Sequence, residues 1–179
     1  MKATGIVRRI DDLGRVVIPK EIRRTMRIRE GDPLEIYTDK EGGVIFKKYS
    51  LMGGVTEFAG QLCETLNRTC GHVCVITDRD SCIAVSGAPR KELLDKQVST
   101  ELEQLMEGRQ IYQYQEGNPI PLCSDGDKYK VLTAAPILSE GDVLGSVLLA
   151  GTGTDTRPGE VEYKLVQAVA GFLGRHMES

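Results

Sequence analysis

The sequence lacks any apolar run near the length of about 20 residues that a membrane-spanning helix needs. Its first residues are charged and contain no apolar stretch of the kind found in secretory signals. Five cysteines cannot all pair within one chain, so without an export signal we expect reduced and mostly buried thiols. These absences predict a cytoplasmic protein with no membrane partner.

Catalytic motifs are also missing. The 179 residues include only two histidines, and no nucleophile elbow, phosphate-binding loop or metalloprotease motif occurs. Carboxylate pairs such as Asp78 and Asp80 fall in turn-like segments, where Asp is favoured for backbone reasons. We therefore expect no enzyme activity. An enzyme built on residues 55–179 is the alternative, and it would require a catalytic cluster that the sequence does not show.

The cysteines suggest limited chemistry. Cys70, His72 and Cys74 would share one face if they lay on a strand, but no fourth ligand accompanies them, so we expect no metal. Cys63 and Cys82 are interpreted as core residues. Cys123, in the polar segment 121–126, is a candidate redox-sensitive thiol.

Positive charge is concentrated at the N-terminus. Residues 1–30 hold nine Lys or Arg against four acids, whereas the whole chain has a formal charge of −3. Residues 1–50 carry a net +4, from twelve bases and eight acids, and the other 129 carry −7, from eleven and eighteen. No aromatic residue precedes Tyr37, which disfavours single-strand binding by base stacking. The first part therefore indicates a surface for duplex DNA, and the opposite charges indicate two modules.

The first fifty residues are predicted to form two short hairpins and one short helix. Pro19 suits the first position of that helix, and Gly31-Asp-Pro33 ends it. The expected elements are strands at 5–10 and 15–18, a helix at 19–27, and strands at 34–38 and 44–49. Such a small unit buries too little apolar surface to stand alone. A homodimer whose hairpins share one core is the physical solution we expect.

A helical wheel orders the charges of the predicted helix. Ile22 and Met26 fall on one side, and four cations fall on the other. Four like charges so close repel one another unless an anion binds there. Among the strand arginines, alternation does not decide whether Arg8 or Arg9 faces outward. The candidate cations of this surface are Arg8, Arg9 and Arg15 on the strands, Lys20, Arg23, Arg24 and Arg27 on the helix, and Lys2 before them.

The second part is predicted to be an α+β sandwich. Segment 51–55 is interpreted as a linker, and residues 56–179 as a domain large enough for its own core. Helical spacing marks 55–69, 90–107 and 160–177, and β-branched runs mark strands at 72–78, 82–86, 110–115, 129–137 and 143–151.

The run from Thr4 to Met26, continuing through Gly31 to Tyr37, closely resembles the DNA-binding half of AbrB-like transition-state regulators. The resemblance implies a swapped-hairpin barrel formed by a dimer, with DNA contacts at Arg8, Arg15, Arg23 and Arg24. It also implies recognition that depends partly on DNA shape. With the acidic second part, the chain resembles regulators of sporulation genes that act as activators and repressors, associated with the nucleoid. Antitoxins share the swapped-hairpin fold, so a protein-binding module is the alternative function, although antitoxins end in a disordered acidic tail.

The pattern in 55–179 is similar to a GAF domain, a small-molecule sensing fold. The resemblance leaves two uses open, namely sensing of an unidentified ligand or assembly alone, and it implies no bound cofactor. The helices at 55–69 and 160–177 are expected to pack together, and the apolar stripe of the second is wider than one intramolecular contact needs. This predicts a bundle between chains and a homotetramer, with plain core packing as the alternative. The residues assigned to oligomerisation are Phe58, Leu62, Leu66, Val161, Leu165, Ala168 and Phe172.

Overall fold

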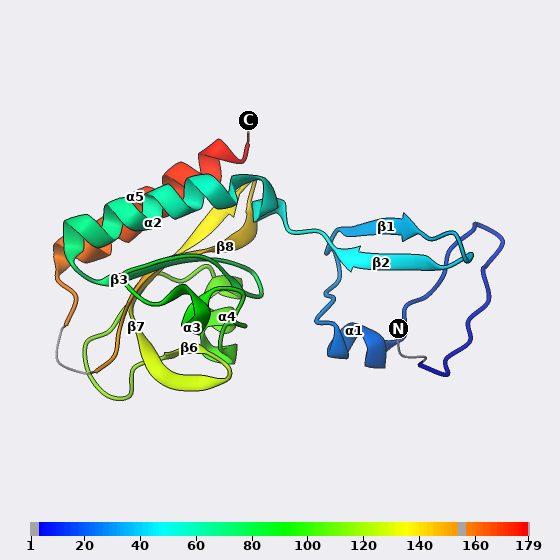
Figure 1. Cartoon of the computed structure of the whole chain (residues 1–179), viewed down its shortest axis with the longest axis horizontal. Coiled ribbons are helices and arrows are strands. Elements are labelled where there is room, and N and C mark those ends of the chain that lie inside the picture. The colour runs from blue at the N-terminus through cyan, green and yellow to red at the C-terminus, as the bar shows by residue number, and fades with distance from the viewer. Residues whose placement is uncertain (1–3, 154–156, 179) are drawn as a thin grey trace. The chain divides into compact units, whose positions relative to one another are not determined.

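The computed structural model describes residues 4–153 and 157–178, and the chain forms two compact units, Met1–Ser50 and Leu51–Ser179 (Figure 1). Each unit has its own elements. The first contains α1 (Lys20–Thr25), β1 (Leu34–Thr38) and β2 (Val44–Lys48). The second contains η1 (Leu51–Val55), α2 (Thr56–Cys70), β3 (Val73–Asp78), β4 (Cys82–Ser86), α3 (Arg90–Leu93), α4 (Thr100–Glu107), β5 (Tyr112–Gln113), β6 (Pro121–Cys123), β7 (Gly126–Ser139), β8 (Asp142–Gly151) and α5 (Glu160–His176).

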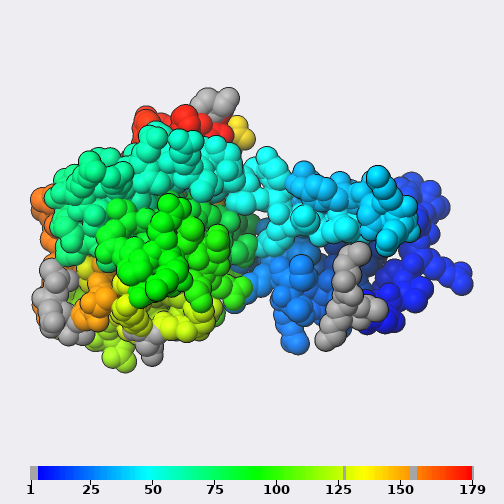
Figure 2. Space-filling view, in the orientation of Figure 1, coloured from blue at the N-terminus to red at the C-terminus, as the bar shows by residue number. Residues whose placement is uncertain are grey.

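The first unit has one of its two predicted hairpins. β1 pairs antiparallel with β2, placing Ile36 opposite Phe46. The expected strands at 5–10 and 15–18 are absent from the single chain, where only the turn between them forms. A strand requires a hydrogen-bonding neighbour, and within the described part of this chain nothing pairs with these two segments. In the space-filling view this dark-blue segment projects from its unit (Figure 2).

No described residue of the first unit is buried, which distinguishes this unit from an ordinary domain. Val7 is 84% exposed, Val17 71% and Ile36 61%. These β-branched residues have the composition of buried strands. The unit therefore has apolar side chains but no interior of its own.

The second unit is an open antiparallel sheet covered on both faces. Its strand order is β4-β3-β8-β7-β5, with β6 also paired to β7. Val147 of β8 lies opposite Ile76 of β3 on one side and opposite Ala135 of β7 on the other. Helices α2 and α5 lie side by side over one face (Figure 1), and α3, α4 and β6 contribute to a second core on the other.

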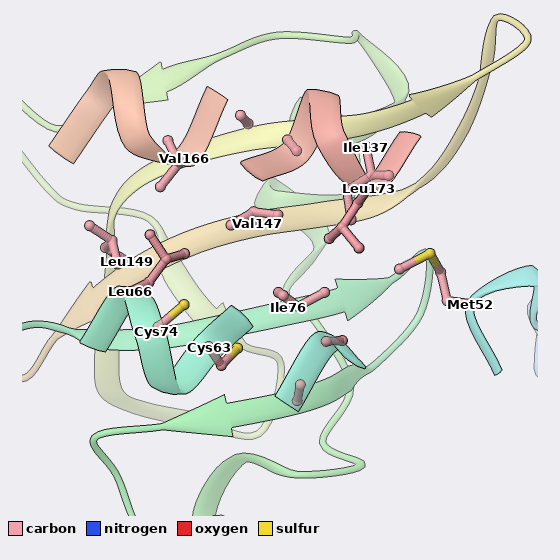
Figure 3. Close-up of a cluster of buried hydrophobic side chains, with 14 of the residues drawn as sticks. Met52, Cys63, Leu66, Cys74, Ile76, Ile137, Val147, Leu149, Val166 and Leu173 are labelled. Atoms are coloured by element: carbon pink, nitrogen blue, oxygen red, sulfur yellow. The ribbon is translucent and has the colours of Figure 1, made fainter. Parts of the chain in front are cut away.

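The core beneath α2 and α5 includes Met52, which is fully buried and drawn with that cluster in Figure 3. The interpretation of 51–55 as a linker is therefore wrong, because this segment is the 3₁₀ helix η1 and belongs to the second unit. A long apolar side chain that reaches the core holds the segment in place. In the sequence, Gly53 and Gly54 suggested a linker and gave no indication of the contact made by Met52.

The predicted helix at 90–107 is interrupted. Only α3 and α4 are helical, because Asp95 adopts a left-handed backbone with φ 61° and residues 96–98 run as an extended segment. Gln97 bridges to Ser81, and Val98 bridges to Cys123. Pairing with segments distant in sequence overrides the local helical pattern here. The other helices and strands expected in the second unit form, with β5 shorter and β6 additional.

We expect Gly174→Ala to lower the free energy of unfolding by about 1–3 kcal/mol. A Cβ at this position of α5 would lie 2.0 Å from the carbonyl oxygen of Leu138 in β7, so helix and strand would have to separate. Gly171→Ala, in the same helix, is the control, because its Cβ would meet nothing within 4 Å. That change should raise stability by up to about 1 kcal/mol through helix propensity.

Thermal and denaturant unfolding of the two variants beside the parent measures the difference. Equal stability of the two variants would contradict the close approach of α5 to β7.

Candidate nucleic-acid interface

The loop at 11–15 is closed by one aspartate. Asp11 Oδ1 accepts backbone hydrogen bonds from Leu13 at 3.0 Å and from Arg15 at 2.8 Å. The backbone N–H of Asp11 donates to the carbonyl of Arg15 at 3.0 Å, and Gly14 provides the left-handed residue with φ 76°. Asp and Gly thus perform the turn chemistry that the sequence indicated.

The same carboxylate orients the side chain of Arg15. Arg15 Nε donates to Asp11 Oδ2 at 2.8 Å, while the Arg15 side chain stays 68% exposed. The hydrogen bonds from the backbone and then from the side chain of Arg15 lower the pKa of Asp11, so the carboxylate is charged at neutral pH. Because Nε is the atom that is held, the two terminal nitrogens of the guanidinium remain directed toward solvent. A fork so positioned suits a phosphate or a guanine edge.

Helix α1 presents the second group of cations. Lys20 and Arg24 are exposed, and Arg23 is half-buried. Arg23 Nε is buried and has no hydrogen-bond partner among the described residues. A buried donor of this kind is destabilising while it is unpaired, so it favours the binding of an additional acceptor. A second protomer or a phosphate could supply that acceptor.

Arg27 differs from its place on the helical wheel. The helix ends in a Schellman motif, in which Ile28 N–H donates to Arg23 O at 2.7 Å and Arg27 N–H donates to Arg24 O at 3.3 Å. Arg27 itself has φ 51°, a conformation usually left to glycine. Met26, on the apolar side of the predicted helix, is 55% exposed. The wheel therefore holds only for Lys20–Thr25, and Arg27 belongs to the turn that follows.

The remaining predicted DNA contacts lie near the N-terminus. Arg8 and Arg9 are both exposed on the segment that has no strand partner, so the single chain does not select between them. Lys2 lies outside the described residues. Sequence reasoning missed Asp11, whose position four residues before Arg15 was the available signal.

The predicted oligomerisation residues on the helices of the second unit fall into three sets by their burial. Leu66 is only 4% exposed and packs in the intramolecular core, so its assignment to an interface is wrong. Phe58, Leu62 and Leu165 are half-buried at the edge of that core. Val161 is 68% exposed, Phe172 is 53% exposed, and Ala168 is exposed. The core face of α5 consists of Val166, Ala170, Leu173 and Gly174.

An aromatic cluster extends the exposed stripe of α5, which consists of Val161, Ala168 and Phe172. The ring centroids of Phe58 and Phe172 are 5.9 Å apart, which joins α2 to α5. His176 adds a third ring, 5.2 Å from Phe58 and 6.3 Å from Phe172. The sequence did not indicate His176, which lies one helical turn after Phe172.

The possible metal ligands do not converge. Cys70 ends α2, where Gly71 caps the helix in a left-handed conformation, so Cys70 and Cys74 are not on one strand. Cys74 is fully buried, and the His72 carbonyl accepts a hydrogen bond from Asn67. Over residues 4–153 and 157–178, no group of three or more His, Cys, Asp or Glu could hold a metal ion. Within the same residues, every helix is too short or too polar to cross a bilayer.

Comparison with known proteins covers both units. The family model "Stage V sporulation protein T C-terminal, transcription factor" matches residues 54–178, and "Antidote-toxin recognition MazE, bacterial antitoxin" matches residues 7–51. Stage V sporulation protein T of Bacillus subtilis is 49% identical over 179 residues, 99% of each chain. Transition state regulatory protein AbrB of the same organism is 65% identical over 49 residues, which are 27% of this chain and 50% of AbrB.

Among solved structures, a GAF domain/HD domain protein from Geobacter sulfurreducens superposes with a TM-score of 0.50. It is 16% identical and covers 69% of this chain and 91% of its own. This likeness confirms the GAF-type α+β fold predicted for the second unit. The match to AbrB confirms the AbrB-like character of the first.

We expect Asp11→Asn to weaken duplex DNA binding roughly two- to fivefold, the range for loss of one exposed ion pair. The amide retains an oxygen for the backbone donors of the loop but loses the charge that holds Arg15 Nε. Asp12→Asn is the matched control, because it removes the same charge from an exposed neighbour. If only net charge mattered, both variants would bind DNA more tightly. Fluorescence anisotropy with a labelled duplex separates the two, and tighter binding by Asp11→Asn would contradict the positioning role.

Proposed function

This chain belongs to the stage V sporulation protein T family of sporulation transcription factors, and from that membership we propose that its first unit binds duplex DNA as an intertwined homodimer. The proposed contacts are Arg8, Arg15, Arg23 and Arg24, with Lys2, Arg9, Lys20 and Arg27 in secondary roles. The single observation that carries the proposal is the lack of any buried residue among residues 4–50.

A second protomer supplies what this unit lacks. Segments 5–10 and 15–18 have strand composition and no strand neighbour, and apolar residues such as Val7, Val17 and Phe46 lie at the surface. Exchange of these segments between two chains would give them hydrogen-bonding partners and a shared core. Burial of this apolar surface is the driving force for association.

Dimerisation also concentrates charge. Each copy of residues 1–50 carries a net +4, so two copies carry twice that charge next to one DNA site. Arg15, held by Asp11, and Arg24, exposed on α1, present guanidinium groups from two different elements. Arg23 brings a buried Nε that needs an acceptor. Phosphate contacts position such a protein, and the flexibility of the duplex contributes to selectivity.

For the second unit we propose assembly of dimers into a homotetramer. The exposed stripe of α5 and the aromatic cluster with Phe58 form an apolar surface at the edge of the intramolecular core. Two helices from each chain could form a bundle there. A tetramer would present two DNA-binding dimers, and linkage would raise affinity for paired sites through effective concentration.

We further propose that the protein is not an enzyme and that it acts in the cytoplasm, on DNA of the nucleoid. Binding of a small-molecule ligand by the GAF-type unit remains a prediction from the resemblance of this unit to GAF domains. The antitoxin alternative shares the fold of residues 7–51. It is disfavoured because the chain after Ser50 folds into a unit with two cores of its own, instead of a free acidic tail.

We expect Arg24→Ala to weaken duplex binding by about 1–3 kcal/mol if this side chain contacts a base edge. Arg68→Ala is the control, since Arg68 is exposed on α2 and pairs with Glu64 within the second unit. Unchanged affinity in both Arg23→Ala and Arg24→Ala would remove α1 from the DNA interface.

The affinity of the parent protein for duplex DNA should also fall steeply between about 50 and 200 mM salt, because phosphate contacts release counterions.

We expect Phe172→Glu to convert tetramers into dimers, because a charge would enter the centre of the proposed helical bundle. Ile111→Glu is the control, since Ile111 is 44% exposed and lies outside both long helices. Light scattering coupled to size exclusion gives the mass of each species. A tetramer that survives Phe172→Glu, or a parent protein that is dimeric, would contradict the assembly.

A further inference from the structure

Four of the five cysteines form two pairs, one in each core of the second unit. Cys63 and Cys74 belong to the core beneath α2 and α5, where Figure 3 draws them close together. Cys82 and Cys123 belong to the core on the opposite face of the sheet. All of them are free thiols. The two pairs provide the same chemistry in two different surroundings.

Cys82 and Cys123 approach each other across a short extended segment. Cys82 begins β4, and its N–H donates to the carbonyl of Lys96 at 2.9 Å. Cys123 ends β6 and forms a bridge with Val98. Both side chains enter the same core, and the two thiols lie close enough for each to shift the pKa of the other. Residues 41 positions apart in sequence are thereby placed for reaction with one another.

The two thiols of this pair are not equivalent. The hydrogen bond from Cys82, with a further contribution from Lys96, lowers the pKa of Cys123. The same hydrogen bond and burial raise the pKa of Cys82. Cys123 is therefore the thiol that more readily becomes the nucleophilic thiolate, and Cys82 remains protonated beside it.

Cys123 also has access to solvent. It lines a pocket of about 310 Å³ together with Ser99, Pro121 and Ser124. Cys82 is fully buried behind it, whereas 8% of Cys123 is exposed. A small polar oxidant can thus reach Cys123 first. The pair Cys63 and Cys74 has no exposed surface on either residue.

We propose that Cys82 and Cys123 form a peroxide-reactive dithiol site, in which Cys123 opens to the pocket and Cys82 resolves the product. The Cys123 thiolate attacks one oxygen of hydrogen peroxide, the O–O bond breaks, and Cys123 sulfenic acid and water form once a proton is taken up. The Cys82 sulfur then attacks the Cys123 sulfur and releases a second water. Two thiols and one peroxide become one disulfide and two waters, so peroxide is reduced as the thiols are oxidised.

The resulting disulfide would link β4 to β6 on either side of residues 96–98. Because residues 96–98 lie between the two strands and a disulfide usually needs Cα atoms within about 7 Å, formation of the bond requires β4 and β6 to move toward each other. Both cysteines belong to the second unit, so the site can be tested without DNA.

The test uses the full chain, reduced, freed of reductant and treated with hydrogen peroxide at neutral pH. We expect a mass lower by about 2 Da, the two hydrogens lost on disulfide formation, reversed by dithiothreitol. Peptide mapping should find Cys82 joined to Cys123. Cys63 and Cys74 should oxidise at least about tenfold more slowly, because a sealed pair reacts only after local opening.

Two single variants separate the roles. Cys82→Ser should leave Cys123 as a sulfenic acid that dimedone traps, and Cys123→Ser should abolish both the disulfide and the dimedone adduct at this site. Circular dichroism verifies that each variant is folded. Oxidation of Cys63 and Cys74 at the same rate as Cys82 and Cys123, or failure of dimedone to label Cys123 in folded Cys82→Ser, would overturn the proposal.

Discussion

Burial of apolar surface that a single chain cannot cover is the constraint behind the proposed assembly. Within residues 4–50 even the β-branched side chains are exposed, and the segments around Arg8 and Arg15 have no strand neighbour. A second chain would complete such a unit in the proposed dimer. In that dimer, the shared core would also bring the arginines of two chains to one DNA site. Dimerisation and recognition would then be two consequences of one deficit.

The second unit buries its apolar side chains in two cores within one chain. Its sheet is covered on both faces, and Gly174 lets α5 approach the carbonyl of Leu138 so closely that the helix seals one core. The side of α5 that faces the core buries Val166, Ala170 and Leu173. The apolar side chains of Val161 and Phe172, on the same helix, remain exposed. This apolar surface, which remains after the core is complete, is the basis of the proposed contact with a further chain.

Local electrostatics refine both units. In the first, Asp11 holds the loop backbone and the Arg15 side chain with one carboxylate, so a turn residue also orients a cation. In the second, a hydrogen bond between two thiols makes Cys123 and Cys82 chemically unequal although both lie in one core. Each effect depends on contact distance and not on residue type alone.

The sequence by itself determined the two modules, the position of α1 after Pro19, the long helices, β3, β4, β7 and β8, and the cluster of arginines. These features depend on local periodicity, turn chemistry and charge, which neighbouring residues carry. Only the tertiary structure decided that Met52 is core, that Leu66 faces inward while Phe172 faces outward, and that residues 94–99 interrupt a helical pattern. It also decided that Asp11 holds Arg15 and that Cys82 meets Cys123. Burial and pairing are relations between segments that meet only on folding, and the pattern within one segment does not contain its partner.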